Sequence, residues 1–237
     1  MVFNQYEVTT MNFYILQFFS ILVLCSALAC NTVNSSAVST SAQPAPEVNT
    51  GDVISNSEGT QTAVFAGGCF WGVEAVFERI KGVTDVKSGY SGGSAKNANY
   101  DDVSDGKTEH AEAVLITFDS SRVSYKQLLQ VFFSVAHDPT ELNRQGPDTG
   151  PQYRSAIFFT NDGQKSEAES YIAELKTGKV FPKPIVTQIV ALEKFYDAEA
   201  YHQDYLAHNL DSPYIIAHDL PKLENLQKQF PTLYARK

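Results

Sequence analysis

The sequence predicts an α+β fold, a two-layer sandwich in which helices cover a mixed sheet with a split β-α-β, ferredoxin-like core. Two observations lead to this prediction. Short apolar runs rich in β-branched residues alternate with longer segments in which apolar residues recur at helical spacing. Between residues 62 and 160 these segments follow one another in the order β-α-β-β-α-β, which is the order of a split β-α-β core.

The first strand and the first helix are predicted on either side of a glycine pair. Residues 62–66 form an apolar run that stops at Gly67 and Gly68, as a buried strand does when it ends in a tight turn. Apolar side chains then recur at helical spacing over residues 70–80. Cys69 is therefore expected at the turn from strand to helix.

The remaining elements are predicted from the same two periodicities. Further strands are expected at 83–90, 111–118, 155–160 and 185–192. Further helices are expected at 124–136, 162–176, 197–208 and 221–230. Ser124 is suited to cap one of these helices, and either Asn161 or Asp162 another. Two polar loops, 91–109 and 137–154, are expected to connect the strands.

The first 59 residues are predicted to lie outside the domain, which is expected at 60–237. Residues 1–30 contain an apolar run followed by small residues, as in a secretory signal, and Leu28-Ala29-Cys30 resembles a bacterial lipobox in which Cys30 is lipidated. Residues 31–59 have the composition of a flexible polar linker. We therefore expect a periplasmic or membrane-anchored protein. Because no Lys or Arg precedes the apolar run, two alternatives stay open: an uncleaved hydrophobic anchor, or a cytoplasmic enzyme with a wrongly assigned start.

Charge and cysteine content exclude several classes of function. A net charge of -9 argues against a nucleic-acid partner. The chain has three cysteines, and Cys25 and Cys30 lie in the N-terminal segment, so a disulfide framework is not expected. The five histidines show no metal-ligand spacing, and neither a metal nor an organic cofactor is expected.

Cys69 is the first candidate for chemistry. At a helix N-terminus, unpaired N–H groups and the helix dipole favour a thiolate over a thiol. Glycines on both sides leave the sulfur open to a ligand. The alternative is that Cys69 is a small buried apolar residue, since free cysteine is often fully buried.

Glu112 is the second candidate. In a strand over 111–118, alternation places it on the same apolar face as Val114 and Ile116. Burial there raises the pKa of a carboxyl group, which can then hold a proton near neutrality and deliver it. The alternative is a glutamate at the end of a strand that reaches solvent.

The loop around residues 137–155 is long for a compact domain and is dense in glycines and hydrogen-bonding side chains. Loops of this length tend to be functional. Individual residues also have structural explanations, such as the initiation of a turn by Asp138-Pro139.

Taken together, four motifs resemble the peptide methionine sulfoxide reductases of the A type: Gly68-Cys69-Phe70-Trp71-Gly72, His110-Ala111-Glu112, the 137–155 loop and Tyr201-His202-Gln203-Asp204-Tyr205-Leu206. The resemblance covers about residues 62–224. It implies thiol-dependent reduction of methionine-S-sulfoxide, free or in proteins, and hence the repair of oxidised proteins.

The resemblance also implies the roles of individual residues. Cys69 would attack the sulfoxide sulfur and become a sulfenic acid, while Glu112 would protonate the sulfoxide oxygen. A substrate site is implied with five further members: Phe70 and Trp71 around the S-methyl group, Tyr100 and Tyr153 as hydrogen-bond donors, and Asp148 on the polar side.

Some positions depart from the family pattern, namely Ser104, Glu109, Pro147 and Ile215. Ile215 stands where relatives often carry a resolving cysteine, and no cysteine follows Cys69. We therefore expect an external reductant, either thioredoxin-like, glutaredoxin-like or a small thiol.

Two other functions remain open from the residues alone. One is a thiol peroxidase-like enzyme in which Cys69 reduces hydroperoxides. The other is a non-enzymatic lipoprotein that binds thioether or methyl groups with Phe70 and Trp71.

Overall fold

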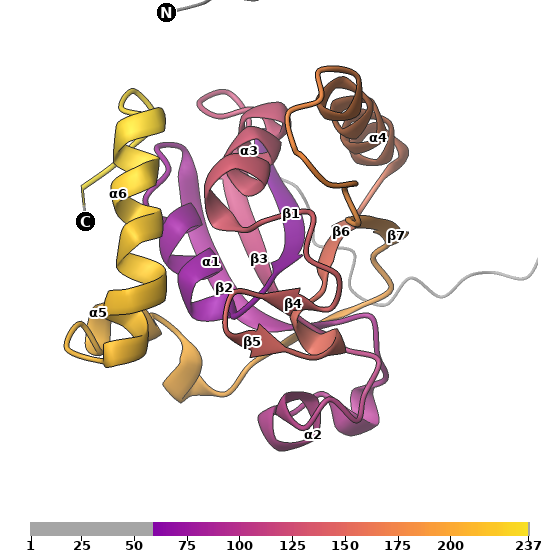
Figure 1. Cartoon of the computed structure of the whole chain (residues 1–237), viewed down its shortest axis with the longest axis vertical. Helices are drawn as coiled ribbons and strands as arrows, with labels where there is room; N and C mark the ends of the chain where they lie inside the picture. The colour runs from indigo at the N-terminus through magenta and orange to yellow at the C-terminus, as the bar shows by residue number, and fades with distance from the viewer. Residues whose placement is uncertain (1–58, 237) are drawn as a thin grey trace, which may run out of the picture. The chain divides into compact units, whose positions relative to one another are not determined.

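The computed structural model describes residues 59–236, which contain a mixed sheet of six strands with helices packed against it (Figure 1). The strands lie in the order β7-β6-β1-β3-β2-β8. Their bounds are β1 Thr60–Gly67, β2 Val83–Ser91, β3 Ala111–Asp119, β6 Ser155–Phe159, β7 Gln188–Ala191 and β8 Phe195–Asp197. Neighbouring strands are antiparallel except β6 and β7.

The four central strands confirm the predicted split β-α-β core. β3 lies between β1 and β2, which are joined through helix α1 (Phe70–Glu78). β1 lies between β3 and β6, which are joined through α3 (Tyr125–Val131) and the 137–154 loop. The α+β class predicted from the order of elements is therefore correct.

The main core lies between one face of the sheet and four helices. Besides α1 and α3 these are α4 (Asp162–Thr177) and α6 (Leu220–Gln229), and each contributes buried apolar residues to the core. Strand alternation supplies the other side, because Val114 and Ile116 point into this core. Glu112 lies two residues before Val114 in β3, so alternation places it on the same face.

Among residues 59–236, it is a chain segment and not a helix that covers the second face of the sheet. Only residues 192–194 separate β7 from β8, although these strands form opposite edges of the sheet. Leu192 and Phe195 therefore pack across this face, against a cluster rich in alanine: Val64, Ala66, Ala111, Ala113, Ala156 and Phe158. The small alanine side chains let the segment approach the strands closely.

Several helix ends follow the predicted caps. Ser124 and Gln127 form a reciprocal capping box at the start of α3. Asn161 rather than Asp162 caps α4, since its side chain accepts from the Gln164 N–H. The predicted helix 124–136 changes character after α3, because its last turn is a π-helix, Phe132–Ala136.

The C-terminal part differs from the prediction. Instead of one helix over 197–208, the chain forms β8, a 3₁₀ turn (Ala200–His202) and a short helix α5 (Tyr205–His208). Asp204 adopts a left-handed conformation with φ 53°, which interrupts the helix. The predicted strand 185–192 shortens to β7.

Both loops that were predicted to be irregular contain short elements. Residues 91–109 include a 3₁₀ turn (Ala95–Asn97) and helix α2 (Tyr100–Ser104). Residues 137–154 include a two-stranded hairpin and a further 3₁₀ turn: β4 Arg144–Gln145, β5 Asp148–Thr149 and Pro151–Tyr153. Gln145 in this hairpin packs against Gly68, in the turn that precedes α1.

The predictions for the N-terminal segment concern residues that lie outside the described range. These are the signal and lipoprotein segment 1–30 with Cys30, and the linker 31–59 apart from Gly59. Among residues 59–236, no helix is long and apolar enough to cross a membrane. In the same part of the chain, no group of three or more His, Cys, Asp or Glu side chains is placed to hold a metal ion.

Candidate active site

Cys69 lies at the turn from β1 into α1, as the glycine pair predicts. It occupies the N-cap position of α1, and its side chain is 8% exposed. Gly68 makes the turn with φ +90°, and a Cβ there would lie 2.6 Å from Cβ of Gln145 in the hairpin. Glycine is required at this position for both reasons.

Glu112 is buried on the helix-covered face of β3, as alternation predicts. It is 2% exposed, and its Oε2 accepts a hydrogen bond of 3.0 Å from the Phe70 N–H at the start of α1. Burial raises the pKa of Glu112 to about 8, and the Asp148 carboxylate adds to this, while the Phe70 N–H acts in the opposite direction. The carboxyl group therefore holds its proton at neutral pH.

The thiol of Cys69 behaves differently from the prediction. Burial raises its pKa, and the carboxylates of Glu112 and Asp219 raise it further. The Trp71 N–H and the Lys222 ammonium lower the pKa but are outweighed. The expectation that the helix N-terminus favours a thiolate is therefore wrong for the resting protein, because desolvation and nearby carboxylates outweigh it.

The two predicted hydrogen-bond donors both lie near Glu112 and Cys69. Tyr100 begins α2, and Tyr153 ends the 3₁₀ turn that follows the hairpin. Burial first, and then the negative charge of Glu112, raises the pKa of each phenol, and Cys69 adds to the effect. Both hydroxyl groups therefore keep their protons and can donate hydrogen bonds.

Asp148 lies in β5 and faces this group from the hairpin. Its Oδ2 accepts a short hydrogen bond from the Tyr214 hydroxyl. Tyr214 precedes a π-helix, Ile215–Asp219, so this contact joins the hairpin to the C-terminal part of the chain. The sequence did not single out Tyr214.

The two predicted pocket aromatics are placed differently. Phe70 is 1% exposed and packs against Tyr90 and His202. Trp71 is half-buried, stacks on Tyr205 with centroids 3.7 Å apart and an interplanar angle of 9°, and donates from Nε1 to His202 Nδ1 over 3.1 Å. Trp71 therefore keeps part of its ring accessible, whereas Phe70 is buried in the main core.

A cavity of about 320 Å³ opens beside Cys69. Besides Cys69, its walls come from the end of the π-helix Phe132–Ala136, from the loop with the hairpin and from the C-terminal elements. The lining residues are Cys69, Val135, Ala136, His137, Asp138, Glu141, Gln145, Gly146, Pro147, Asp148, Tyr214, His218 and Lys222. This volume is at the lower end of the range for small-molecule sites. Of the seven predicted site residues, Cys69 and Asp148 line it.

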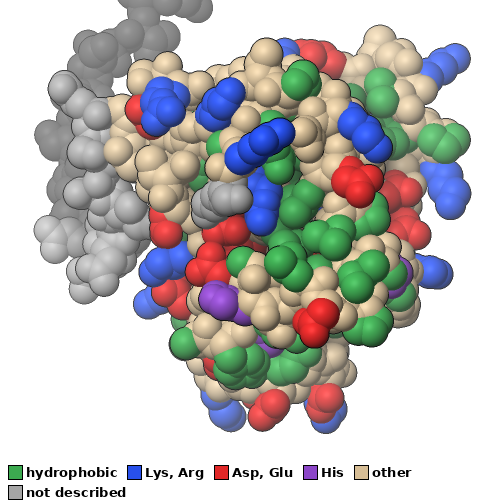
Figure 2. Space-filling view, turned by 90° about the vertical axis from the view of Figure 1, so that its left-hand side faces the viewer, with side chains coloured by type: hydrophobic (Ala, Val, Ile, Leu, Met, Phe, Trp, Pro, Cys, Tyr) green, Lys and Arg blue, Asp and Glu red, His purple; other side chains and the backbone are tan. Residues whose placement is uncertain are grey.

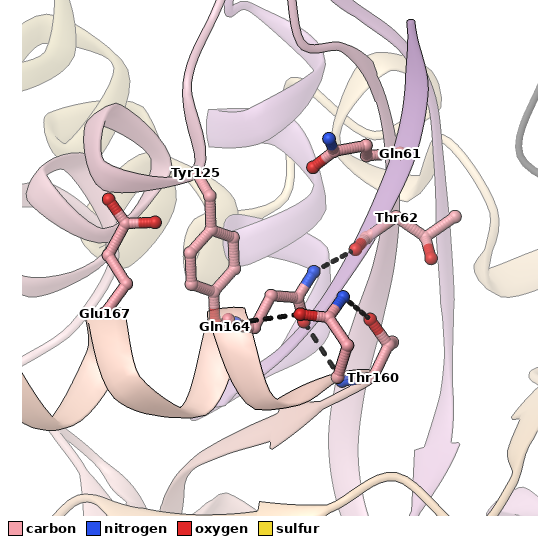
Figure 3. Close-up of a pocket in the computed structure, with 8 residues that line it drawn as sticks. Gln61, Thr62, Tyr125, Thr160, Gln164 and Glu167 are labelled. Atoms are coloured by element: carbon pink, nitrogen blue, oxygen red, sulfur yellow. Dashed lines mark hydrogen bonds between the residues drawn. The ribbon is translucent and has the colours of Figure 1, made fainter. Parts of the chain in front are cut away.

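A second cavity of about 300 Å³ lies beside the start of α4 (Figure 3). The Gln164 side chain spans it, donating to the Thr62 carbonyl over 2.6 Å and accepting from the Thr160 N–H over 3.0 Å. Its lining residues, all within the described range, include neither Cys nor His. We therefore place the chemistry at the cavity beside Cys69.

Sequence reasoning missed the charged pair Asp219 and Lys222, which packs against α1. Figure 2 shows the side of the molecule that carries α5 and α6, where acidic, basic, histidine and apolar side chains are all present. The one signal in the sequence is the opposite charge of two residues three apart at the start of a helix. That pattern is common on solvent-exposed helices and does not indicate burial.

Comparison with protein families gives one match over most of the chain. The model of the family described as "Peptide methionine sulfoxide reductase" matches residues 61–233. A curated protein from Mesorhizobium japonicum, peptide methionine sulfoxide reductase MsrA 2, is 57% identical over 76% of this chain and 92% of its own length. A protein of the same name from Synechocystis is 51% identical over 79% of this chain and 87% of its own length.

Solved structures show the same similarity. Mxr1 from Saccharomyces cerevisiae, in reduced form, superposes with a TM-score of 0.61 at 30% identity, covering 77% of this chain and 95% of its own. Methionine sulfoxide reductase A of Corynebacterium diphtheriae superposes with a TM-score of 0.57 at 34% identity, covering 65% of this chain and 77% of its own.

Proposed function

Because the chain belongs to the A-type family of peptide methionine sulfoxide reductases and catalyses the thiol-dependent reduction of methionine-S-sulfoxide, we propose that Cys69 and Glu112 carry out its chemical step. Cys69 is the nucleophile and Glu112 the general acid. The peroxidase and binding-protein alternatives are set aside, since the relatives are reductases of methionine sulfoxide.

The proposed reaction uses Glu112 in its resting, protonated state, whereas Cys69 must first ionise. Cys69 first loses its proton to solvent, and the thiolate attacks the sulfoxide sulfur while protonated Glu112 gives its proton to the sulfoxide oxygen. The new S–S bond then breaks as the hydroxyl group passes from the substrate sulfur to the Cys69 sulfur, and the thioether leaves. Tyr100 and Tyr153 donate hydrogen bonds to that oxygen, on which negative charge would otherwise develop. The sum of the step is thiol plus sulfoxide giving sulfenic acid plus thioether, so protons and electrons balance.

One observation carries the assignment of the acid. The hydrogen bond from the Phe70 N–H holds the Glu112 carboxyl group next to the residue that follows Cys69. A group positioned in this way, with a pKa of about 8, supplies a proton beside the nucleophile at neutral pH.

The substrate site is proposed to combine an apolar wall with polar groups. The exposed part of the Trp71 ring, above Phe70, takes the S-methyl group, and Asp148 completes the polar side. The position of Trp71 between Tyr205 and His202 supports this, because a ring held on two sides presents a fixed surface.

Resolved epimers of a methionine sulfoxide substrate test the proposal, with dithiothreitol as reductant. We expect turnover of the S-epimer alone, and its loss in Cys69→Ser. Equal turnover of both epimers, or retention of activity in Cys69→Ser, contradicts the assignment.

Recycling is proposed to use an external thiol, because no cysteine follows Cys69. A thiolate of a thioredoxin-like protein, a glutaredoxin-like protein or a small thiol attacks the sulfenic sulfur, water leaves and a mixed disulfide forms. A second thiol then releases reduced Cys69 as the disulfide of the reductant forms.

Export is a separate proposal that rests on the sequence of residues 1–30. The small residues before Cys30 suggest cleavage and lipidation at that cysteine. Intact-mass analysis of protein from the native host tests this, and an unprocessed soluble chain beginning at Met1 or Met11 contradicts it.

A further inference from the structure

A buried ion pair lies at the start of α6. Nζ of Lys222 donates to Oδ1 of Asp219 over 3.1 Å. The Asp219 side chain is 0% exposed and that of Lys222 is 23% exposed. The second carboxylate oxygen, Oδ2 of Asp219, is also buried and has no hydrogen-bond partner among residues 59–236.

The pair rests directly on the first turn of α1, which follows Cys69. A Cβ at Gly72 would lie 2.0 Å from Oδ1 of Asp219 and 2.7 Å from Nζ of Lys222. The absence of a side chain at Gly72 is therefore what lets both charges reach the helix. Lys222 also lines the same cavity as Cys69.

We propose that Asp219 and Lys222 are positioning residues that control how readily the Cys69 thiol ionises, with Asp219 opposing the thiolate and Lys222 favouring it. The proposal rests on the role of Cys69 as the nucleophile. It extends that role to Asp219 and Lys222, which lie 150 and 153 positions after Cys69 in the chain.

A gain in folding stability is a weak explanation for the buried pair of Asp219 and Lys222. A buried ion pair loses hydration that its Coulomb attraction often fails to offset, and an unpartnered carboxylate oxygen adds to the cost. The larger influence on the thiol is expected from Asp219, which is fully dry, because water screens the partly exposed Lys222. The pKa of Cys69 agrees, since Asp219 raises it more than Lys222 lowers it.

This arrangement has a use in a protein exposed to oxidants. The thiolate is the form that reacts readily, so a thiol kept protonated at rest is protected from unspecific oxidation.

Other titratable or charged groups that face this part of the molecule are Glu112 on β3, Asp148 on β5, Tyr100, Tyr153, His137, Asp138 and Glu141 in the loops, and Tyr214 and His218 beside α6.

The test measures the ionisation of Cys69 without any sulfoxide. The rate of alkylation by iodoacetamide is followed against pH on the Cys69 peptide by mass spectrometry, which separates it from Cys25 and Cys30. We expect Lys222→Met to slow alkylation at pH 8 by roughly threefold or more, and Asp219→Asn to accelerate it by a similar factor. The rate at the alkaline plateau should stay unchanged in both.

The matched control is Lys228→Met on the same helix, where Lys228 is 71% exposed and pairs with Glu224. This control should leave the alkylation profile as in the wild type. If Lys222→Met unfolds because Asp219 loses its partner, the double variant Asp219→Asn with Lys222→Met removes both charges, and its profile should lie between those of the wild type and Asp219→Asn.

Opposite shifts of the two alkylation profiles indicate an electrostatic role. Because both single variants break the same Asp219–Lys222 contact, a purely structural role would shift both profiles in the same direction. Shifts in the same direction, or no shift in either variant, overturn the proposal. Because alkylation needs no turnover, that result leaves the assignment of Cys69 as nucleophile untouched, whereas the epimer assay tests the assignment itself.

Discussion

The backbone N–H of Phe70 donates to Oε2 of Glu112 over 3.0 Å, although the residues are 42 positions apart in the chain. This bond ties the first turn of α1 to β3. It places a carboxyl group with a pKa of about 8 beside the nucleophile, so the fold itself sets the distance between acid and thiol.

Glu112→Gln should lower kcat by roughly 10²–10⁴-fold and change KM little, because a general acid acts in the transition state. In the wild type, kcat should rise with pH up to about 8 as more Cys69 thiolate forms, and should level off above about 8 because protonated Glu112 is then lost as the thiolate increases. Steady-state kinetics from pH 6 to pH 10 measures this. A variant with the full wild-type rate near neutrality contradicts the role of proton donor.

Stability should fall as pH rises from about 5 to about 8. Burial raises the pKa of both Glu74 and Glu112 to about 8, so the folded chain binds more protons than the unfolded chain over this range. Each group contributes stability that is present in full below its unfolded pKa of about 4.5 and is lost as pH rises to about 8, with a slope of about -1.4 kcal/mol per pH unit between these values. Urea unfolding at several pH values measures the slope. Glu74→Gln should reduce it, and Glu169→Gln on exposed α4 surface should leave it unchanged.

Gly72→Ala should destabilise the protein by about 1–3 kcal/mol, since the new methyl group meets the buried Asp219 carboxylate and forces it to move. Gly163→Ala in the first turn of α4 is the control. There a Cβ would meet the Asn161 side chain at 3.1 Å, and we expect an effect close to neutral. Thermal unfolding compares the two. Equal effects would rule out close packing at Gly72 as the cause.

Trp71→Ala should raise KM by about tenfold, equivalent to ~1.4 kcal/mol, and lower kcat less, because it removes an apolar wall and no reacting group. Tyr205→Leu removes the stacking partner alone and should give a smaller increase in KM. Kinetics with a dabsylated methionine-S-sulfoxide substrate measure both. A loss confined to kcat in Trp71→Ala contradicts a role in substrate binding.

A single turnover without reductant should oxidise one thiol per chain and form no internal disulfide. A resolving thiol would have to come within disulfide distance of Cys69, with Cα atoms no more than about 7 Å apart, and Cys25 and Cys30 are the only other cysteines in the sequence. Dimedone labelling and peptide mass spectrometry detect the sulfenic acid on Cys69. A bridge from Cys69 to Cys25 or Cys30 contradicts this prediction.

Much of the site follows from local sequence rules. The glycine pair and helical spacing place Cys69 at the start of α1, and strand alternation places Glu112 on the covered face. Both positions depend only on residues within one element or in elements that are adjacent in the sequence. The 137–155 loop was also identified, because its length and polar content are unusual, although its hairpin was not.

The remaining features depend on contacts between distant segments. His202, Tyr205 and Asp219 reach the site only because the C-terminal part folds back onto α1, which no local periodicity predicts. The direction of the Cys69 pKa shift was wrong for the same reason. A helix N-terminus is visible in the sequence, whereas desolvation and two carboxylates from other elements are not.

The two edges of the sheet, β7 and β8, both belong to the ten residues 188–197. A ribosome must therefore release this stretch before either edge is closed. Until then β6 and β2 are the two edge strands, and each presents unpaired backbone groups on its outer side. Such exposed edges are where the sheets of separate molecules can pair. C-terminal truncations before Gln188 should consequently be lost to aggregation during synthesis, and not persist as soluble chains with reduced activity.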